Sequence, residues 1–146
     1  MTNIDVTDEF EIRLLYARYA RAIDEGDGEA WAACYTSDGT YWSSTFGTRT
    51  GRPALRDFAV NHCQEWHDQG IRTQHWISQT LLEPAPWGIA ARTYVLLMGT
   101  TAAGPPTAML QTEYHDQLVR EDGSWRLHRR ESHAQCSLNL PPTVDS

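Results

Sequence analysis

The chain has 146 residues, the size of one domain that can bury a core without metals or disulfides. Its net charge is −7, and no dense basic cluster favours binding to nucleic acid or to an anionic membrane. It has no apolar run of roughly 20 residues, no leader-like start and three cysteines without CxxC spacing, so we expect a single soluble, cytoplasmic domain over residues 1–146.

The chain begins with a predicted amphipathic helix. From residue 8 to residue 25, apolar side chains recur at three- and four-residue steps, with acidic residues in the first turn. Asp5 or Thr7 can cap its start, and Gly26 ends it.

Four further elements are predicted in the first half of the chain. A second short helix is predicted over residues 27–35, followed by a turn at 37–39. Residues 40–50 are rich in Thr and aromatic residues and contain a glycine, which predicts two short strands joined by a turn. A third helix is predicted to begin at Pro53 and to stop at Gly70.

The second half is predicted to consist of strands. Four segments are rich in β-branched and aromatic residues and are separated by Pro- and Gly-containing breaks: 71–83, 88–100, 107–120 and 124–135. Helices followed by strands indicate an α+β fold with a curved antiparallel sheet and the helices on one side. We expect residues 1–6 and 140–146 to be loose tails.

Five segments of the sequence share the pattern of one protein superfamily. They are Tyr19-x-x-x-x-Asp24, Trp31-x-x-Cys34-Tyr35-Thr36-x-Asp38-Gly39, Gly51-Arg52-Pro53-Ala54-Leu55, His75 on a strand, and Tyr114-x-Asp116-x-Leu118-Val119-Arg120-x-Asp122-Gly123-x-Trp125-Arg126. With them, the chain resembles the SnoaL-like branch of the nuclear transport factor 2-like superfamily. The resemblance implies a cystatin-like conical barrel, in which a bent sheet wraps a long helix around a pocket.

Asp24 and His75 are the residues that point to chemistry. Asp24 lies at a helix end whose unpaired carbonyls disfavour a carboxylate, so a cationic partner such as imidazolium would stabilise it. A carboxylate that orients an imidazole makes a general base suited to removing a proton from carbon. By resemblance, the two positions match the Asp/His dyad of hexachlorocyclohexane dehydrochlorinase, scytalone dehydratase and bile acid 7α-dehydratase, which carry out eliminations.

Tyr19, Tyr114 and Arg130 are candidates to stabilise the charge that such a reaction develops. Their O–H and N–H groups can donate to an oxyanion or to a departing hydroxyl. The resemblance implies that Arg130 helps the leaving group and that a tyrosine at position 19 favours dehydration over dehalogenation. Simple alternation from Trp125 would turn Arg130 away from the core, so its inward aim requires a β-bulge.

A hydrophobic, ring-bearing substrate needs an apolar cavity. The residues expected to line it are Tyr41, Trp42, Phe46, Trp76 and Met109. We expect no cofactor and no metal, since this acid/base chemistry needs neither, and His62 and His67 do not share a helix face. The pattern assigns no role to the remaining histidines, which are His115, His128 and His133.

Three functions remain open from the sequence. The first is a cofactor-independent lyase of the dehydratase type acting on a small hydrophobic, hydroxylated substrate, and the second is an isomerase or cyclase of polyketide- or steroid-type substrates. The third is a non-catalytic ligand-binding domain, in which Asp24 is a turn residue, His75 a strand histidine and Tyr19 a core residue. We also expect a homo-oligomer, a dimer or else a trimer, because the curved sheet leaves an apolar outer face.

Overall fold

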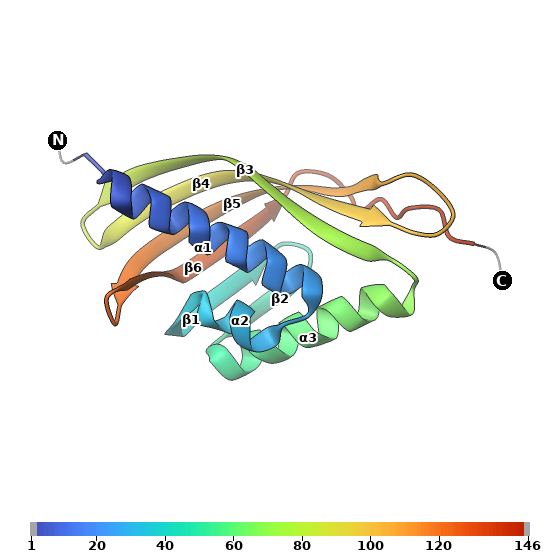
Figure 1. The fold of residues 1–146 in the computed structure, drawn as a ribbon, viewed down its shortest axis with the longest axis horizontal. Coiled ribbons are helices and arrows are strands. Elements are labelled where there is room, and N and C mark those ends of the chain that lie inside the picture. Colours follow the sequence, from blue (N-terminus) through green and yellow to red (C-terminus); the bar gives the residue numbers. More distant parts are fainter. Residues whose placement is uncertain (1–2, 145–146) are drawn as a thin grey trace.

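The computed structural model describes residues 3–144 and has three helices on one side of a six-stranded curved sheet (Figure 1). In chain order, the elements are α1 (Val6–Glu25), α2 (Gly28–Ala33), β1 (Tyr35–Ser43), β2 (Gly47–Thr50), α3 (Arg52–Asp68), β3 (Arg72–Ala85), β4 (Gly88–Thr100), β5 (Thr107–Glu121) and β6 (Ser124–Ala134). The predicted cystatin-like α+β fold is confirmed. Within the described residues, no helix combines the length and the apolar character needed to cross a membrane.

Helix α1 begins and ends where its capping residues predict, whereas α2 ends early. The Asp5 side chain accepts a hydrogen bond from the Thr7 N–H at the start of α1, and Gly26 closes the helix with φ 70°. Helix α2 is shorter than predicted because the chain has already entered β1 at Tyr35, which pairs with Leu127 of β6. This pairing fixes the chain in an extended conformation where the sequence alone predicted one more helical turn.

The sheet has the strand order β2-β1-β6-β5-β4-β3. Neighbouring strands are antiparallel except for β1 and β6, which are parallel, so the prediction of a fully antiparallel sheet was wrong for this pair. Strands β2 and β3 form the two ends of the sheet, and the sheet is open rather than a closed barrel. Helices α1 and α3 contact β3, and α3 also contacts β2, so helices rather than strand pairing cover the gap between the ends.

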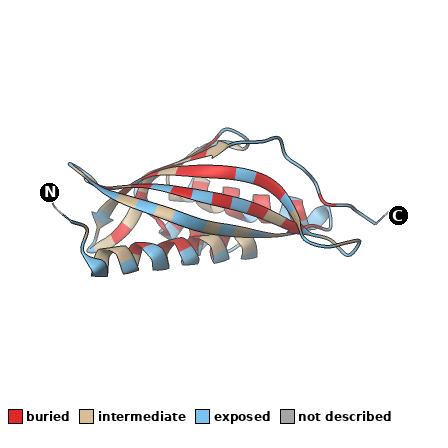
Figure 2. Cartoon of the chain, turned by 90° about the horizontal axis from the view of Figure 1, so that it is seen from above, coloured by how far each residue is buried: buried red, intermediate tan, exposed pale blue. Residues whose placement is uncertain are grey.

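The main core lies between α1, α2, α3 and the concave face of the sheet. Figure 2 shows buried and exposed residues alternating along the strands, as expected when one face packs on helices. On β4, for example, Val95 and Leu97 are buried, whereas Tyr94 and Leu96 are exposed on the opposite face. The predicted homo-oligomer, which would cover such residues, remains a prediction.

A β-bulge in β6 sets which of its side chains face the helices. Between two consecutive residues of β5, the partner on β6 changes from Leu127 to Arg129, which leaves His128 as the extra residue. The alternation therefore shifts by one, and both Leu127 and Arg130 are buried on the concave side. The bulge that an inward Arg130 required is present.

The chain beyond β6 packs against the sheet edge in part. Pro141 is buried, and the Pro142 carbonyl accepts a hydrogen bond from Thr101 in the loop between β4 and β5. Residues expected to form a loose tail therefore include packed ones, and Val6 already belongs to α1. Residues 1–2 and 145–146 of the predicted tails lie outside the described residues.

Gly88 opens β4 at a position where only glycine fits. Its φ is 153°, and a Cβ there would lie 2.2 Å from the Leu118 carbonyl oxygen on β5. We expect Gly88→Ala to lower the free energy of unfolding by about 3 kcal/mol, measured by urea denaturation. Gly123→Ala is the matched control, because Gly123 has φ 80° but open space around its Cβ position, and it should cost only about 1 kcal/mol. Equal losses would show that the contact with Leu118 is not what excludes a side chain.

Candidate active site

Asp24 and His75 are hydrogen-bonded to each other through two contacts. Asp24 lies in the last turn of α1, and His75 lies on β3. The His75 Nδ1–H donates to Asp24 Oδ1 at 2.6 Å, and the His75 backbone N–H donates to Asp24 Oδ2 at 3.0 Å. One carboxylate therefore holds both the ring and the backbone of His75, and in the neutral ring a proton on Nδ1 makes Nε2 the acceptor nitrogen.

The imidazole separates an inner cavity from an outer cleft. Asp24 lines the cleft, which has a volume of about 1030 Å³, whereas His75 lines both the cleft and the cavity. Nδ1 is held by Asp24, and Nε2 makes no hydrogen bond to the described residues 3–144. The side chains of His75 and Asp24 are 11% and 15% exposed, so the pair is largely removed from water.

The inner cavity is enclosed by aromatic, apolar and hydroxyl-bearing side chains. Its lining consists of Tyr19, Ile23, Trp31, Tyr41, Phe46, Phe58, His62, His75, Val95, Leu97, Leu110, Thr112, Tyr114 and Ser132. The cavity volume is about 20 Å³, which is room for about one water molecule. Among the described residues 3–144, no carboxylate belongs to this lining, so its hydroxyl groups offer neutral hydrogen bonds beside the imidazoles of His62 and His75.

Three tyrosines bring hydroxyl groups to the cavity. Tyr19, Tyr41 and Tyr114 come from α1, β1 and β5 and are all buried. Burial raises the pKa of each of these phenols, so all three stay protonated at neutral pH. They can therefore donate hydrogen bonds to an oxygen of a guest molecule.

Arg130 packs against the rings of Tyr19 and Tyr114 but does not belong to the cavity lining. Its Nε and Nη2 each donate to Asp116 at 2.7 Å, and its guanidinium carbon lies 4.6, 4.3 and 4.0 Å from the ring centroids of Tyr16, Tyr19 and Tyr114. Burial by itself lowers the pKa of the guanidinium, but the Asp116 carboxylate raises it well above its ordinary value. Arg130 therefore stays charged, and its guanidinium packs against the rings of the cavity residues Tyr19 and Tyr114.

Comparison with known proteins identifies the family. The SnoaL-like domain matches residues 5–131, which is most of the chain. The protein belongs to the SnoaL-like family. No protein of curated function matches the chain with significant similarity.

Several solved structures share the fold of this SnoaL-like protein. Rv3472, a function-unknown protein from Mycobacterium tuberculosis, is 31% identical, with 92% of this chain and 78% of that chain covered and a TM-score of 0.77. ActVI-ORFA from Streptomyces coelicolor is 25% identical, with 90% and 97% covered and a TM-score of 0.80. A protein from Catenulispora acidiphila in complex with S-DNPA is 24% identical, with 89% and 95% covered and a TM-score of 0.75.

Two tryptophans predicted to line the cavity of the SnoaL-like protein lie outside it. Trp42 follows the cavity residue Tyr41 on β1 and packs against His133 on the outer face, with ring centroids 5.0 Å apart. Trp76 follows His75 on β3, is 54% exposed and donates through Nε1 to a neighbouring glutamine. Successive side chains of a strand point to opposite faces, so Trp42 points away from the cavity that Tyr41 lines. Trp76 does not line the inner cavity, but it lines the outer cleft together with Asp24 and His75.

Met109 was also predicted to line the cavity, but it lies outside the lining. It is the extra residue of a bulge in β5, where the partner on that strand changes from Leu110 to Ala108 across consecutive residues of β4. Its sulfur fills the space above Gly99, where a Cβ would lie only 2.4 Å away, and it packs in a second core cluster with Trp66. Phe46 and Tyr41, by contrast, lie in the predicted cavity lining.

Trp31 and His62 are among the cavity residues that the sequence did not predict. Trp31 of α2 lines the cavity, and its Nε1–H has no hydrogen-bond partner among residues 3–144. His62 of α3 stacks on Phe58 and accepts a hydrogen bond from Trp66 Nε1 at 3.1 Å. Their apolar helix faces were visible in the sequence, but the fact that these faces meet a cavity was not.

His62 is held neutral in the folded state. Burial, with smaller contributions from His75 and Arg49, lowers the pKa of His62 to about 3 from 6.5. Between these values the unfolded chain binds a proton that the folded chain does not, so acid lowers stability. From pH 7 to pH 5 this group should cost about 2 kcal/mol of unfolding free energy.

We expect His62→Gln, whose amide oxygen can still accept from Trp66, to reduce this loss of stability in acid. The measurement is urea denaturation of both proteins at a series of pH values. His67→Gln makes the same change on the exposed side of α3 and serves as the control. The same acid sensitivity in His62→Gln as in the unmodified protein would contradict the role assigned to burial of this imidazole.

Proposed function

We propose that this protein is a cofactor-independent enzyme that removes a proton from a carbon of a small hydrophobic substrate and eliminates water from it. The observation that carries the proposal is the Asp24–His75 pair, in which the carboxylate binds Nδ1 of an imidazole that lines the cavity and leaves Nε2 available to a substrate. This is the arrangement of a general base whose tautomer and charge are controlled by a partner.

In the proposed reaction, His75 Nε2 takes a proton from a carbon next to a carbonyl group. The electron pair of the C–H bond forms a C=C bond as the neighbouring C–O bond breaks, and the departing hydroxide takes the proton from His75 and leaves as water. Asp24 stabilises the imidazolium between these steps. Hydrogen bonds from Tyr19 and Tyr114 support the negative charge on the carbonyl oxygen.

Arg130 acts as a positioning residue in this scheme. Its guanidinium packs on the rings of Tyr19 and Tyr114 but does not belong to the cavity lining. It therefore supports the hydroxyl donors instead of contacting the leaving group itself.

Substrate binding requires the cavity to enlarge. Pockets for small organic ligands occupy roughly 300–1,000 Å³, far more than the cavity volume of about 20 Å³. Phe46, Phe58 and His62 line both this cavity and an outer groove of about 410 Å³, so displacement of these side chains would join the two spaces. The inner part of the joined space is aromatic and apolar, which fits a ring-bearing substrate, whereas Arg49, Asp57, Asn61 and Glu65 line the outer part.

One observation also favours an isomerase or cyclase. Because burial raises the pKa of Tyr19, Tyr41 and Tyr114, these phenols are better hydrogen-bond donors to an oxyanion than proton donors to a leaving group. An enzyme that only moves a proton or closes a ring needs such donors and no leaving-group acid.

Turnover in deuterated water separates these functions. The full chain is incubated with a set of β-hydroxy ring ketones, and the products are analysed by mass spectrometry. Loss of water supports the dehydratase, whereas deuterium uptake at the carbon next to the carbonyl without loss of water supports the isomerase or cyclase. Ketones that bind but show neither change would contradict both enzymatic functions and leave a ligand-binding domain.

A further inference from the structure

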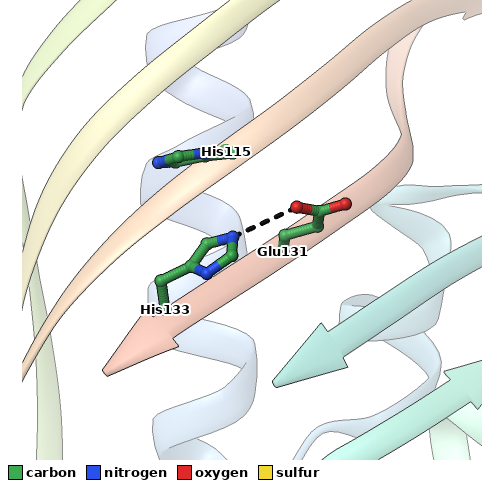
Figure 3. A group of neighbouring side chains, drawn as sticks. All are labelled: His115, Glu131 and His133. Atoms are coloured by element: carbon green, nitrogen blue, oxygen red, sulfur yellow. Dashed lines mark hydrogen bonds and ion pairs between the residues drawn. The ribbon is translucent and has the colours of Figure 1, made fainter. Parts of the chain in front are cut away.

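A cluster of histidine and glutamate side chains lies on the sheet face away from α1 (Figure 3). His115 on β5 is directly opposite Glu131 on β6, and Glu113 is directly opposite His133. Their neighbours in sequence, such as Tyr114 and the bulge-shifted Arg130, point to the concave side. The cluster therefore has no contact with the cavity and takes no part in the proposed reaction.

We propose that His115, Glu131 and His133 bind one divalent transition-metal ion, with Zn²⁺ as the best match. One ligand atom from each of the three residues lies within 4.8 Å of the other two. The His133 Nε2 and Glu131 Oε1 atoms are 3.1 Å apart, close to the separation of about 3.4 Å expected for two ligands of a tetrahedral zinc ion. Two imidazoles and one carboxylate are a common ligand set for this ion.

The side chains can close around an ion without moving the backbone. His115 is 43% exposed and His133 39% exposed, so both rings can rotate by the small amount that the third ligand needs. Their ring centroids are already 4.6 Å apart. Directly opposite residues on antiparallel strands have Cβ atoms about 5 Å apart, which suits two side chains that share one ion.

The groups around the cluster orient the glutamate and balance the charge. Arg129 Nε donates to Glu131 Oε2 at 2.9 Å, which leaves Oε1 to face His133 and the ion. Arg92 binds Glu113, which in turn accepts a hydrogen bond from His115 Nε2 at 3.2 Å. The charges of two arginines and two glutamates cancel, so a cation would enter a patch with little net charge, and water can supply a fourth ligand.

Titration of the full chain with Zn²⁺ by isothermal calorimetry tests the proposal. We expect one ion per chain, and we expect His115→Asn and His133→Asn each to weaken binding by about tenfold or more. His128→Asn, on the same strand but outside the cluster, should leave the affinity unchanged. Cys63→Ser is a second control, because Cys63 and His67 form another pair of possible ligands with Sγ and Nε2 3.9 Å apart.

Two readouts make the test independent of enzymatic activity. A hundredfold excess of Zn²⁺ over Kd should raise Tm by about 5 °C in the unmodified chain and not in His133→Asn. Cu²⁺ should quench the fluorescence of Trp42, whose ring lies 5.0 Å from that of His133, and this quenching should be missing in Trp42→Phe.

Three results would overturn the proposal. They are no Zn²⁺ binding to the folded chain, binding that survives both His115→Asn and His133→Asn, and binding that is lost in Cys63→Ser. Circular dichroism of each variant establishes that it is folded, and both histidines are partly exposed, so their replacement should leave the fold intact.

Discussion

His75→Ala is expected to lower kcat/KM by about 10²- to 10⁴-fold, because the general base is removed while the cavity is retained. Asp24→Asn should also lower it, since an amide in place of the carboxylate no longer stabilises the imidazolium and can orient the ring with the wrong nitrogen protonated. The measurement is the rate of product formation on a substrate found in the mass-spectrometric screen.

The matched control is His128→Ala, which removes a histidine from the bulge of β6, remote from the cavity. It should retain the rate of the unmodified protein. If His75→Ala and Asp24→Asn retained it too, His75 would not be the base, even if the chain still proved to be an enzyme.

Arg130→Met is expected to destabilise the fold by about 3–5 kcal/mol, because it leaves the buried Asp116 carboxylate without its charged partner. Both side chains are fully buried, and Asp116 keeps only the hydrogen bond from Tyr16. Urea denaturation measures the effect. The loss should be larger than for any exposed ion pair, such as Arg13 with Glu9 on α1.

The double variant Arg130→Met with Asp116→Leu is the control. It removes both charges and replaces them with apolar groups, so it should recover a large part of the stability lost in Arg130→Met. If the double variant were less stable than the single one, the cost would come from lost packing on the tyrosine rings and not from an unpaired charge.

In a folded Arg130 variant, a fall in kcat with KM unchanged would support the role of Arg130 in positioning Tyr19 and Tyr114.

The local elements were largely predictable from the sequence. Apolar periodicity and capping residues placed α1 and α3, and the Pro- and Gly-containing breaks separated β3, β4, β5 and β6 close to their observed ends. These signals are local, since a helix cap or a turn depends on residues only a few positions apart. The exception is the start of β1, where pairing with β6, some 90 residues later in the chain, ends α2 early.

The candidate site was predictable in part. Asp24 and His75 were paired by resemblance, and the hydrogen bond between them is observed. Trp42 was misplaced although strand alternation, a rule that the sequence itself supplies, excludes it from the cavity beside Tyr41. Trp76 lines the outer cleft with Asp24 and His75 instead of the inner cavity. Met109 and Arg130 depend on bulges, and a bulge is decided by the partner strand, which the sequence of one strand does not contain.

The sequence by itself determined the helices, the strands and the family of this protein, because periodicity, caps and motifs are properties of neighbouring residues. Only the tertiary structure decided that β1 runs parallel to β6 and that Arg130 packs against the rings of Tyr19 and Tyr114. It also decided that His115, Glu131 and His133 lie close together on the outer face. Each of these depends on the register between strands distant in the chain, where a shift of one residue moves a side chain to the other face of the sheet.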